Sequence, residues 1–141
     1  MITGCPTAMS SAEVRVLQQH ASDKRVVECG ALLGFSTIKL AEVASHVVSI
    51  DKHEGYSGNT FRRYMSNLER ARIRHKVTPM IGDCIKLLPM LKDQQLVFVD
   101  LNGTYHDTLN ALKAIPTIPI KVAIHDFGRA HCHGVELAIR H

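Results

Sequence analysis

Carboxylates and a histidine stand directly at the ends of short apolar runs in this sequence. Asp51 and Asp100 close two of these runs, Asp83 follows a third, and His125 and Asp126 end the last one. Histidine has an unperturbed pKa of about 6.5 and suits proton transfer. Carboxylates accept hydrogen bonds from ribose hydroxyls or bind divalent metals. These residue types indicate a site that binds a polar ligand and takes up a proton.

His125 and Asp126 are the best candidates for a catalytic base. His106 is a second candidate, although it equally fits an ordinary position in the first turn of a helix. Asp100, Asp126 and Asn102 offer the oxygen ligands that Mg²⁺ prefers, and such an ion would bind a diol and lower its hydroxyl pKa. Alternatively, His125 and Asp126 only cap a strand and orient the loop after it.

The cysteines and the histidine-rich segment do not have the spacing of a zinc site. Structural zinc prefers four ligands in recognisable pairs, whereas adjacent residues of the run HCH at 131–133 point in different directions in any regular element. We interpret this segment as a loop over the cleft. No CxxC pair joins the four cysteines, so we expect reduced thiols and a cytoplasmic protein; they are Cys5, Cys29, Cys84 and Cys132.

The elements that must position these residues alternate between strands and helices, which predicts βαβ units and a parallel sheet. Right-handed crossovers favour an α/β, Rossmann-like doubly wound sheet of strand order 3-2-1-4-5, with ligand bound at the carboxyl ends of the strands. We expect one domain over residues 1–141. The predicted strands are 25–29, 46–51, 77–81, 96–100 and 121–125, and the predicted helices are 11–20, 35–44, 60–74, 85–91, 105–114 and 134–140.

The loop after the first strand carries glycines, but in a pattern that disfavours a diphosphate. In VVECGALLGFST, Gly30 permits a tight turn and Gly34 lets the next helix pack closely. Leu32 and Leu33 stand where a dinucleotide loop needs glycine, and no GK[ST] follows for a nucleoside triphosphate. Asp51 lies about 20 residues further on, where a carboxylate can accept both ribose hydroxyls. The segment therefore predicts a ribose-bearing ligand without a diphosphate.

Composition and charge place the chain among ordinary globular domains. Apolar residues make up 45% and charged residues 21% of the 141 residues, and no run approaches the length of a membrane span. The net charge is +4, from 17 basic and 13 acidic residues. Much of it falls between residues 62 and 76, which is a nucleic-acid footprint or the solvated face of a helix. The basic residues there are Arg62, Arg63, Arg70, Arg72, Arg74 and Lys76.

Taken together, these motifs resemble the class I S-adenosylmethionine-dependent methyltransferases, and most closely the small-molecule O-methyltransferase-like group with ExGxxxGxST after the first strand. The resemblance spans nearly the whole chain. It includes the motifs SIDKH, NLERARIRHKVTPMIGD, FVDLNGTYHD and AIHDFG. The residues of the loop that carry it are Glu28, Gly30, Gly34, Ser36 and Thr37.

The resemblance implies a role for each cofactor-binding residue. Gly30 and Ala31 would lie against the methionine part of S-adenosylmethionine, and Ser36 near its carboxylate. Asp83 and Cys84 would flank the adenine. Asp100 would face the cofactor's amino group or, in some relatives, a divalent metal. The full implied set is Glu28, Gly30, Ala31, Gly34, Ser36, Asp51, Asp83, Cys84 and Asp100.

The sequence departs from these relatives in two places. Leu32 replaces the middle glycine of the commoner GxGxG loop. Relatives also continue past the fifth strand and its helix into an antiparallel pair of strands, whereas this sequence stops at His141. We expect a fold without that pair. Because an uncovered strand edge is a liability, we also expect a homodimer or a higher oligomer.

The function that the resemblance implies is methyl transfer to a small hydroxylated acceptor. Such a reaction needs in-line approach of the hydroxyl and removal of its proton. Two alternatives from other classes stay open. The protein could bind S-adenosylmethionine without catalysis, as a sensor or partner subunit, or it could methylate nucleic acid through the basic helix.

Overall fold

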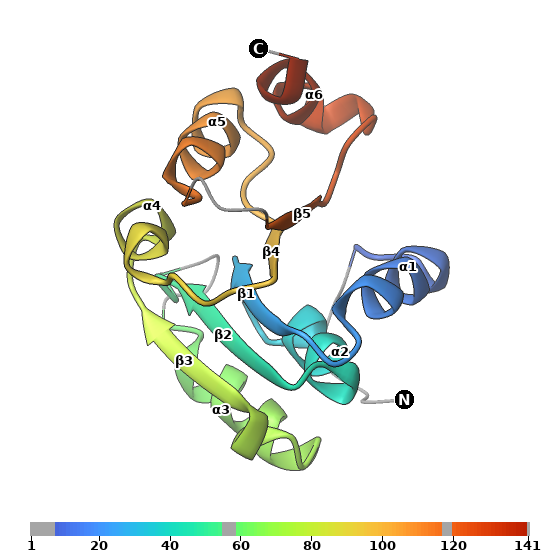
Figure 1. Cartoon of the computed structure of the whole chain (residues 1–141), viewed down its shortest axis with the longest axis vertical. Coiled ribbons are helices and arrows are strands. Elements are labelled where there is room, and N and C mark those ends of the chain that lie inside the picture. The colour runs from blue at the N-terminus through green and yellow to red at the C-terminus, as the bar shows by residue number, and fades with distance from the viewer. Residues whose placement is uncertain (1–7, 55–58, 117–119, 141) are drawn as a thin grey trace.

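The computed structural model describes residues 8–54, 59–116 and 120–140, and its centre is a five-stranded parallel sheet (Figure 1). The strands lie in the order β3-β2-β1-β4-β5, so the predicted order 3-2-1-4-5 is confirmed. The chain reverses the direction in which it adds strands between β1 and β4, and these two strands pair with each other in parallel. The strands are β1 (Arg25–Cys29), β2 (His46–Asp51), β3 (Val77–Ile81), β4 (Leu96–Val99) and β5 (Lys121–Ile124).

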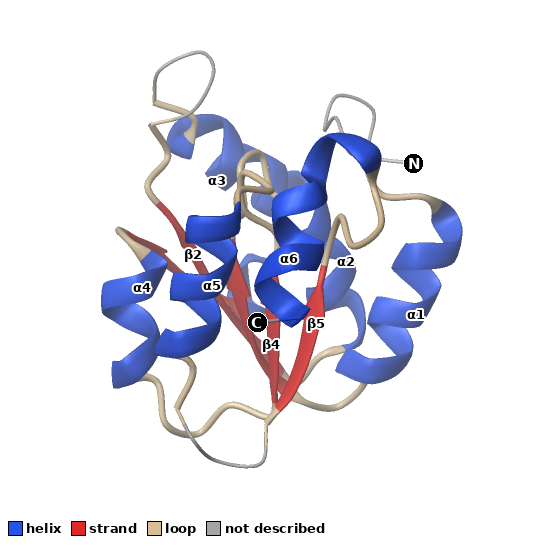
Figure 2. Ribbon diagram, turned by 90° about the horizontal axis from the view of Figure 1, so that it is seen from above, coloured by secondary structure: helices blue, strands red, loops and turns tan. Residues whose placement is uncertain are grey.

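Helices cover both faces of this sheet (Figure 2). One face carries α1 (Ser11–Ala21), α2 (Phe35–Val43) and α3 (Phe61–Arg70). The other carries α4 (Cys84–Leu87) and α5 (Tyr105–Ala114), and α6 (His133–Arg140) packs against α5. Three short 3₁₀ helices complete the described elements: η1 (Arg74–Lys76), η2 (Leu88–Met90) and η3 (Ala130–Cys132).

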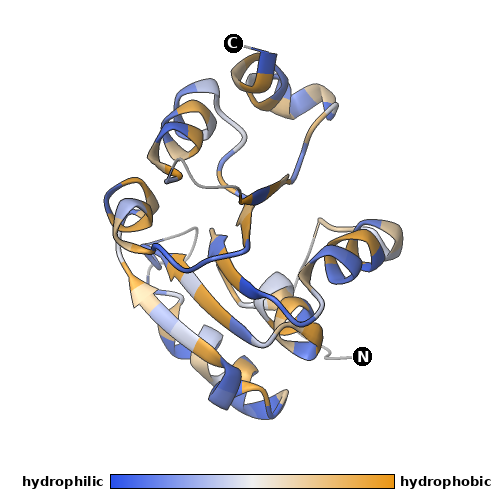
Figure 3. Cartoon of the chain, viewed as in Figure 1, coloured by the Kyte–Doolittle hydropathy of each residue, from blue (hydrophilic) through white to orange (hydrophobic). Residues whose placement is uncertain are grey.

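The strands are apolar on both faces because both faces are covered. Val26 packs among the side chains of α1, α2 and α3, whereas the next residue, Val27, packs toward α4 and α5. Figure 3 shows the hydrophobic colouring along the central strands. No helix in the described part of the chain is long and apolar enough to cross a membrane.

Two predicted helices are shorter by several residues in the structure, for local reasons. The helix predicted over 60–74 ends at Arg70, because Arg72 adopts a left-handed conformation with φ 59° that cannot continue an α-helix. The helix predicted over 85–91 begins at Cys84, where Asp83 caps it, and passes into a 3₁₀ turn at Leu88, next to Pro89. The predicted start of α1 is confirmed, because Ser10 and Glu13 form a capping box.

The fourth and fifth strands each end one residue before their predicted ends. Asp100 and His125 therefore lie just past β4 and β5 rather than within them. Their backbone N–H groups still bond to the neighbouring strand, Asp100 to Cys29 and His125 to Val99. This leaves their side chains at the carboxyl edge of the sheet, where the cavity lies.

Candidate functional site

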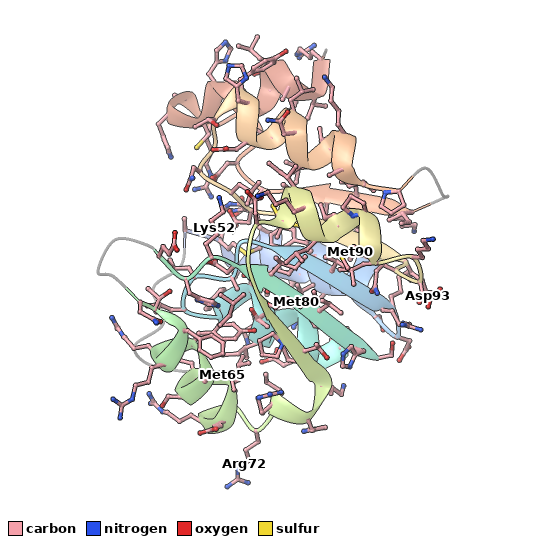
Figure 4. The ribbon with its side chains drawn as sticks, turned by 90° about the vertical axis from the view of Figure 1, so that its left-hand side faces the viewer. Lys52, Met65, Arg72, Met80, Met90 and Asp93 are labelled. Atoms are coloured by element: carbon pink, nitrogen blue, oxygen red, sulfur yellow. The ribbon has the colours of Figure 1, made fainter. Side chains whose placement is uncertain are left out.

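A cavity of about 990 Å³ lies at the carboxyl edge of the sheet. This volume is at the upper end of the range of small-molecule and cofactor sites. Figure 4 shows Lys52, which follows β2 at this edge. The lining comes from all five strand ends: residues 30–33 and Ser36 after β1, Asp51 and Lys52 at β2, residues 82–85 after β3, residues 100–102 after β4, and His125 and Asp126 after β5.

The glycine-bearing loop is packed closely enough to need its first glycine. Gly30 has φ +93°, and a Cβ there would lie 1.9 Å from the backbone oxygen of Asp100. Gly34 has φ +88° and begins α2, with a ring carbon of Tyr64 at 3.0 Å from the position of a Cβ. Gly34 is not part of the cavity lining, so its role in the structure is the close packing of α2.

Asp51 holds this loop through backbone hydrogen bonds. Its Oδ2 accepts the N–H groups of Ala31 and Leu32, each at 2.8 Å. Its Oδ1 accepts the N–H of His53 at 2.6 Å. A carboxylate can accept about four hydrogen bonds, so these three leave capacity for about one more, on Oδ1.

Glu28 lies behind the loop and outside the cavity lining, which corrects its assignment as a residue in contact with the cofactor. Its carboxylate is fully buried and accepts hydrogen bonds from the hydroxyls of Thr37 and Ser49. Burial raises the pKa of Glu28 to about 7, against hydrogen bonds from Ser36, Thr37 and Ser49 that lower it. Ser36, by contrast, does line the cavity.

Asp83 and Cys84 form the wall of the cavity after β3. The carboxylate of Asp83 accepts the N–H of Ile85 at 3.0 Å and lies 3.2 Å from the ammonium of Lys52. Burial raises the pKa of Asp83, but the Ile85 hydrogen bond and Lys52 outweigh it, so the net direction is down. Asp83 is therefore ionised and partly engaged by the protein.

His125 lies between two carboxylates on the opposite wall of the cavity. Its Nδ1 is 3.2 Å from Oδ1 of Asp100 and 3.1 Å from Oδ1 of Asp126. The hydrogen bond with Asp100 is the largest cause of a raised pKa for His125, and it outweighs the lowering by burial. The structure thus brings together the three residues that the sequence predicted at the ends of β4 and β5.

Glu13 and Arg129 belong to the same cluster, and sequence reasoning did not place them there. The guanidinium of Arg129 lies 3.1 Å from the carboxylate of Asp126 and 3.3 Å from that of Glu13. It also donates a hydrogen bond of 2.8 Å to the backbone oxygen of Ala8. Glu13 is also 3.7 Å from Nε2 of His125. In the sequence, Glu13 is explained by the capping box of α1, so nothing there indicates its contacts with His125 and Arg129. The start of α1 is thereby tied to the end of β5.

The cluster does not fit the predicted Mg²⁺. The donor atoms of Asp100, His125 and Asp126 do lie within 4.8 Å of one another. However, the Asp126 oxygen that would bind the ion is already paired with the guanidinium of Arg129, which would repel a cation. Mg²⁺ also prefers an all-oxygen octahedral shell, and the central group here is an imidazole. Arg129 instead pairs with Asp126 and Glu13.

His106 lies outside the cavity lining, which corrects its assignment as a candidate base. It is exposed in the first turn of α5, where its ring meets that of Tyr105 with centroids 5.3 Å apart. The neighbouring Asp107 does line the cavity, and so do His131 and Cys132 from the histidine-rich segment. The helical phase of α5 decides which of the adjacent residues 106 and 107 faces the cavity.

Comparison with known proteins gives a family match and several similar folds. The family described as a methyltransferase domain matches residues 27–135, which include the loop, Asp51, Asp100 and His125. No curated protein matches the chain.

Three solved structures illustrate the similarity. Cofactor-bound Rv0187 from MTB is 22% identical with a TM-score of 0.72, over 96% of this chain and 69% of that one. The O-methyltransferase TomG from Streptomyces achromogenes, involved in tomaymycin synthesis and solved with SAM, is 22% identical with a TM-score of 0.69, over 94% and 68%. An rRNA methylase from Streptococcus thermophilus is 16% identical with a TM-score of 0.69, over 96% and 81%. At these identities the structures establish a shared fold.

Proposed function

This chain belongs to the methyltransferase-domain family, and from that premise we propose that it transfers the methyl group of S-adenosylmethionine to a hydroxyl of a small acceptor. One observation carries the proposal. A single cavity is lined on one side by the glycine-bearing loop and Asp51, and on the other by the Asp100–His125 pair. Cofactor and acceptor would therefore meet between these two walls. The fold shared with an O-methyltransferase that holds SAM supports this assignment.

The cofactor would lie along the wall formed by β1, β2 and β3. Residues 30–33 would pass against its methionine part, with the Ser36 hydroxyl near the carboxylate. The open position on Oδ1 of Asp51 would accept one ribose hydroxyl. Asp83 and Cys84 would flank the adenine, at the position where they line the cavity. The loop, Asp51 and Asp83 are already fixed by protein hydrogen bonds, which reduces the entropy lost on binding.

The acceptor would lie toward Asp100 and His125. A hydroxyl must lose its proton as its oxygen attacks the methyl carbon. The side chain of Asp100 is more exposed to the cavity than that of His125, so the hydroxyl would hydrogen-bond to Asp100. The proton would pass to the Asp100 carboxylate, which the Nδ1–H of His125 holds in place.

Two measurements test this proposal. Titration calorimetry with S-adenosylhomocysteine should show binding, and a panel of phenols, catechols and sugar alcohols should release S-adenosylhomocysteine from S-adenosylmethionine. Tight binding without turnover across the panel would favour the non-catalytic alternative. Absence of binding by correctly folded protein would overturn the proposal.

One observation favours nucleic acid as the acceptor instead. Arg62, Arg63 and Arg70 line a hollow on α3, and no ion pair to them is found in the part of the chain that the structure describes. Arg72 also projects outward, as Figure 4 shows. Arg74 and Lys76 are different, because they bond to backbone oxygens of Val77 and of Ala41 and Ala44.

Salt dependence distinguishes this candidate. If α3 holds RNA, replacing Arg62, Arg63 and Arg70 by alanine should lower the slope of log affinity against log salt by about two. Salt-independent binding, or no binding to RNA, would leave the small acceptor as the substrate class.

We also propose that a second copy of the chain covers β5. In the described residues, β5 pairs only with β4. Val122 on β5 and Leu137 and Ile139 on α6 are exposed apolar side chains. Sedimentation should give a dimer mass that Val122→Glu converts to a monomer, whereas Val16→Glu, at an exposed apolar position on α1, should not. A monomer at all concentrations would exclude this.

A further inference from the structure

The imidazole of His53 is buried directly behind the cofactor wall. His53 is only 4% exposed, and the cavity lining includes the residues on either side of it, Lys52 and Glu54, but not His53 itself. Nδ1 of the imidazole lies 3.0 Å from the hydroxyl oxygen of Thr60. The ring of Phe61 meets the imidazole edge to face, with centroids 5.2 Å apart. The side chain is therefore held by the start of α3.

The helix that holds the imidazole is also attached to the glycine-bearing loop. The ring of Tyr64 lies with its centroid 4.9 Å from that of His53. The same tyrosine is fully buried and packs against Gly34, where a Cβ would lie 3.0 Å from a ring carbon. Asn67, further along α3, donates a hydrogen bond of 2.8 Å to the backbone oxygen of Leu33. The imidazole, α3 and the loop thus form one packed unit.

The backbone of His53 connects this unit to Asp51. Its N–H donates a hydrogen bond of 2.6 Å to Oδ1 of Asp51, and its carbonyl accepts the N–H of Thr60 at 3.0 Å. His53 has a φ of 55°, in the left-handed region that non-glycine residues rarely adopt. Such a conformation persists only where the surrounding contacts fix it. Here the buried imidazole and Thr60 provide those contacts, and they hold the N–H toward Asp51.

We propose that His53 is a positioning residue for the cofactor site, which holds Asp51 in the orientation that receives the ribose. This inference rests on the proposed cofactor. Oδ2 of Asp51 accepts the N–H groups of Ala31 and Leu32, so Oδ1, which His53 contacts, is the oxygen left for the ligand. Without the His53 N–H, the carboxylate is held at one oxygen only and can turn about its Cβ–Cγ bond.

A buried imidazole makes this arrangement depend on pH. Burial lowers the pKa of His53 and outweighs the opposing effect of the Asp51 charge. Of the other ionisable groups nearby, Lys52 and Glu54 are adjacent in the chain, and burial raises the pKa of Tyr64 on α3 well above its ordinary value, so the phenol stays neutral. The neutral imidazole therefore fits the pocket, and a proton disfavours it there. Cofactor affinity should be full above the unperturbed pKa of about 6.5 and be lost as pH falls through the pKa of the buried ring.

The first experiment measures S-adenosylhomocysteine affinity by titration calorimetry at about pH 7.5, where the imidazole is neutral. His53→Ala should weaken binding by about tenfold, the effect of one hydrogen bond to a charged group. His53→Asn should bind like the wild type, because asparagine tolerates a left-handed backbone and places an amide atom where the imidazole has Nδ1. His46→Ala is the matched control and should leave the affinity unchanged. His46 begins β2 and bonds to the Thr78 hydroxyl at 2.9 Å, away from the cavity lining.

The second experiment follows the same affinity from about pH 7.5 down to about pH 5. The wild type should lose affinity below about pH 6.5, whereas His53→Asn, which has no titrating group at this position, should lose less. His125 on the opposite wall titrates in both proteins, so its contribution cancels. Equal affinity of folded His53→Ala and wild type, or equal pH profiles of wild type and His53→Asn, would overturn the proposal. If thermal unfolding shows that His53→Ala does not fold, Thr60→Val, which removes only the hydroxyl partner, takes its place.

Amide hydrogen exchange separates this inference from the proposed function. If the wild type does not bind S-adenosylhomocysteine, the proposed function fails, and exchange in the free protein still tests the role of His53. The N–H groups of Ala31 and Leu32, which Asp51 accepts, should exchange faster in His53→Ala than in wild type or His53→Asn at the same pH. Unchanged exchange at both amides would show that His53 does not hold Asp51.

Discussion

The carboxylate of Asp51 accepts the backbone N–H of Ala31 at 2.8 Å, so the end of β2 fixes the loop that follows β1. The same oxygen accepts the N–H of Leu32, whose φ of 47° is left-handed. A leucine in that conformation is strained by about 1–2 kcal/mol, and the charge-assisted hydrogen bonds offset the strain. The acid expected to bind ribose is therefore also the group that shapes the loop.

Asp51→Ala should weaken S-adenosylhomocysteine binding by about tenfold or more, because it removes a charged acceptor worth about 1.5–3 kcal/mol per hydrogen bond. It should also destabilise the loop itself. Calorimetry gives the affinity, and thermal unfolding shows whether the fold survives. Glu54→Ala is the control, since Glu54 is an exposed acid on the same cavity and its loss should have little effect. Equal effects of the two variants would remove Asp51 from this role.

Gly30→Ala should destabilise the protein strongly, because the added Cβ would lie 1.9 Å from the backbone oxygen of Asp100. Backbone must move to relieve that overlap. Gly128→Ala is the matched substitution: Gly128 also has positive φ, +77°, but nothing lies within 4 Å of its Cβ position. It should cost only the conformational strain, about 1–2 kcal/mol. Urea denaturation of both variants measures the difference, and a smaller loss for Gly30→Ala would contradict the close packing of the loop.

Glu28→Gln should change how stability depends on pH. Burial raises the pKa of Glu28 from 4.5 to about 7, so the folded protein holds this proton more tightly than the unfolded chain does. The protonated carboxyl therefore contributes to the unfolding free energy fully below pH 4.5, and this contribution is lost as pH rises through about 7. Relative to the wild type, the variant should gain roughly 2 kcal/mol in unfolding free energy between pH 5 and pH 8. Parallel stability curves for the two proteins would show that Glu28 does not titrate in this range.

Asp100→Asn should lower the pKa of His125, because the hydrogen bond to Asp100 is the main cause of its raised value. Proton NMR titration of the imidazole measures this directly and does not depend on activity. The wild-type pKa should lie above 6.5, and the variant should titrate at a lower pH. His20→Gln is the control variant, and it should leave the titration of the His125 imidazole unchanged. If Asp100→Asn leaves the titration unmoved, Asp126 or Glu13 controls the imidazole instead.

The raised pKa of His125 also has a consequence for stability. A histidine that binds its proton more tightly when folded contributes stability that is fully present below the unfolded value of about 6.5. This contribution is lost as pH rises through the folded pKa. His125→Gln should therefore reduce the difference in unfolding free energy between pH 6 and pH 9. Chemical denaturation at the two pH values measures it, and an unchanged difference would show that the imidazole is not stabilised by its carboxylates.

Much of the fold follows from local patterns in the sequence. The apolar runs predicted all five strands to within a residue, and the strand order followed from their alternation with helices. Helix ends were less predictable. Arg72 ends α3 through a left-handed conformation, and no residue type in that stretch marks such a turn, because arginine rarely adopts it.

The sequence alone determined which residues stand at the carboxyl ends of the strands, and so it placed Asp51, Asp100 and His125 at one edge of the sheet. That inference needs only the periodicity of strands and the rule that parallel strands end together. Tertiary structure decided what each side chain faces there. It turned Glu28 inward to Thr37 and brought Arg129 to Asp126 and Glu13, because contacts between residues far apart in the chain depend on how helices pack on the sheet.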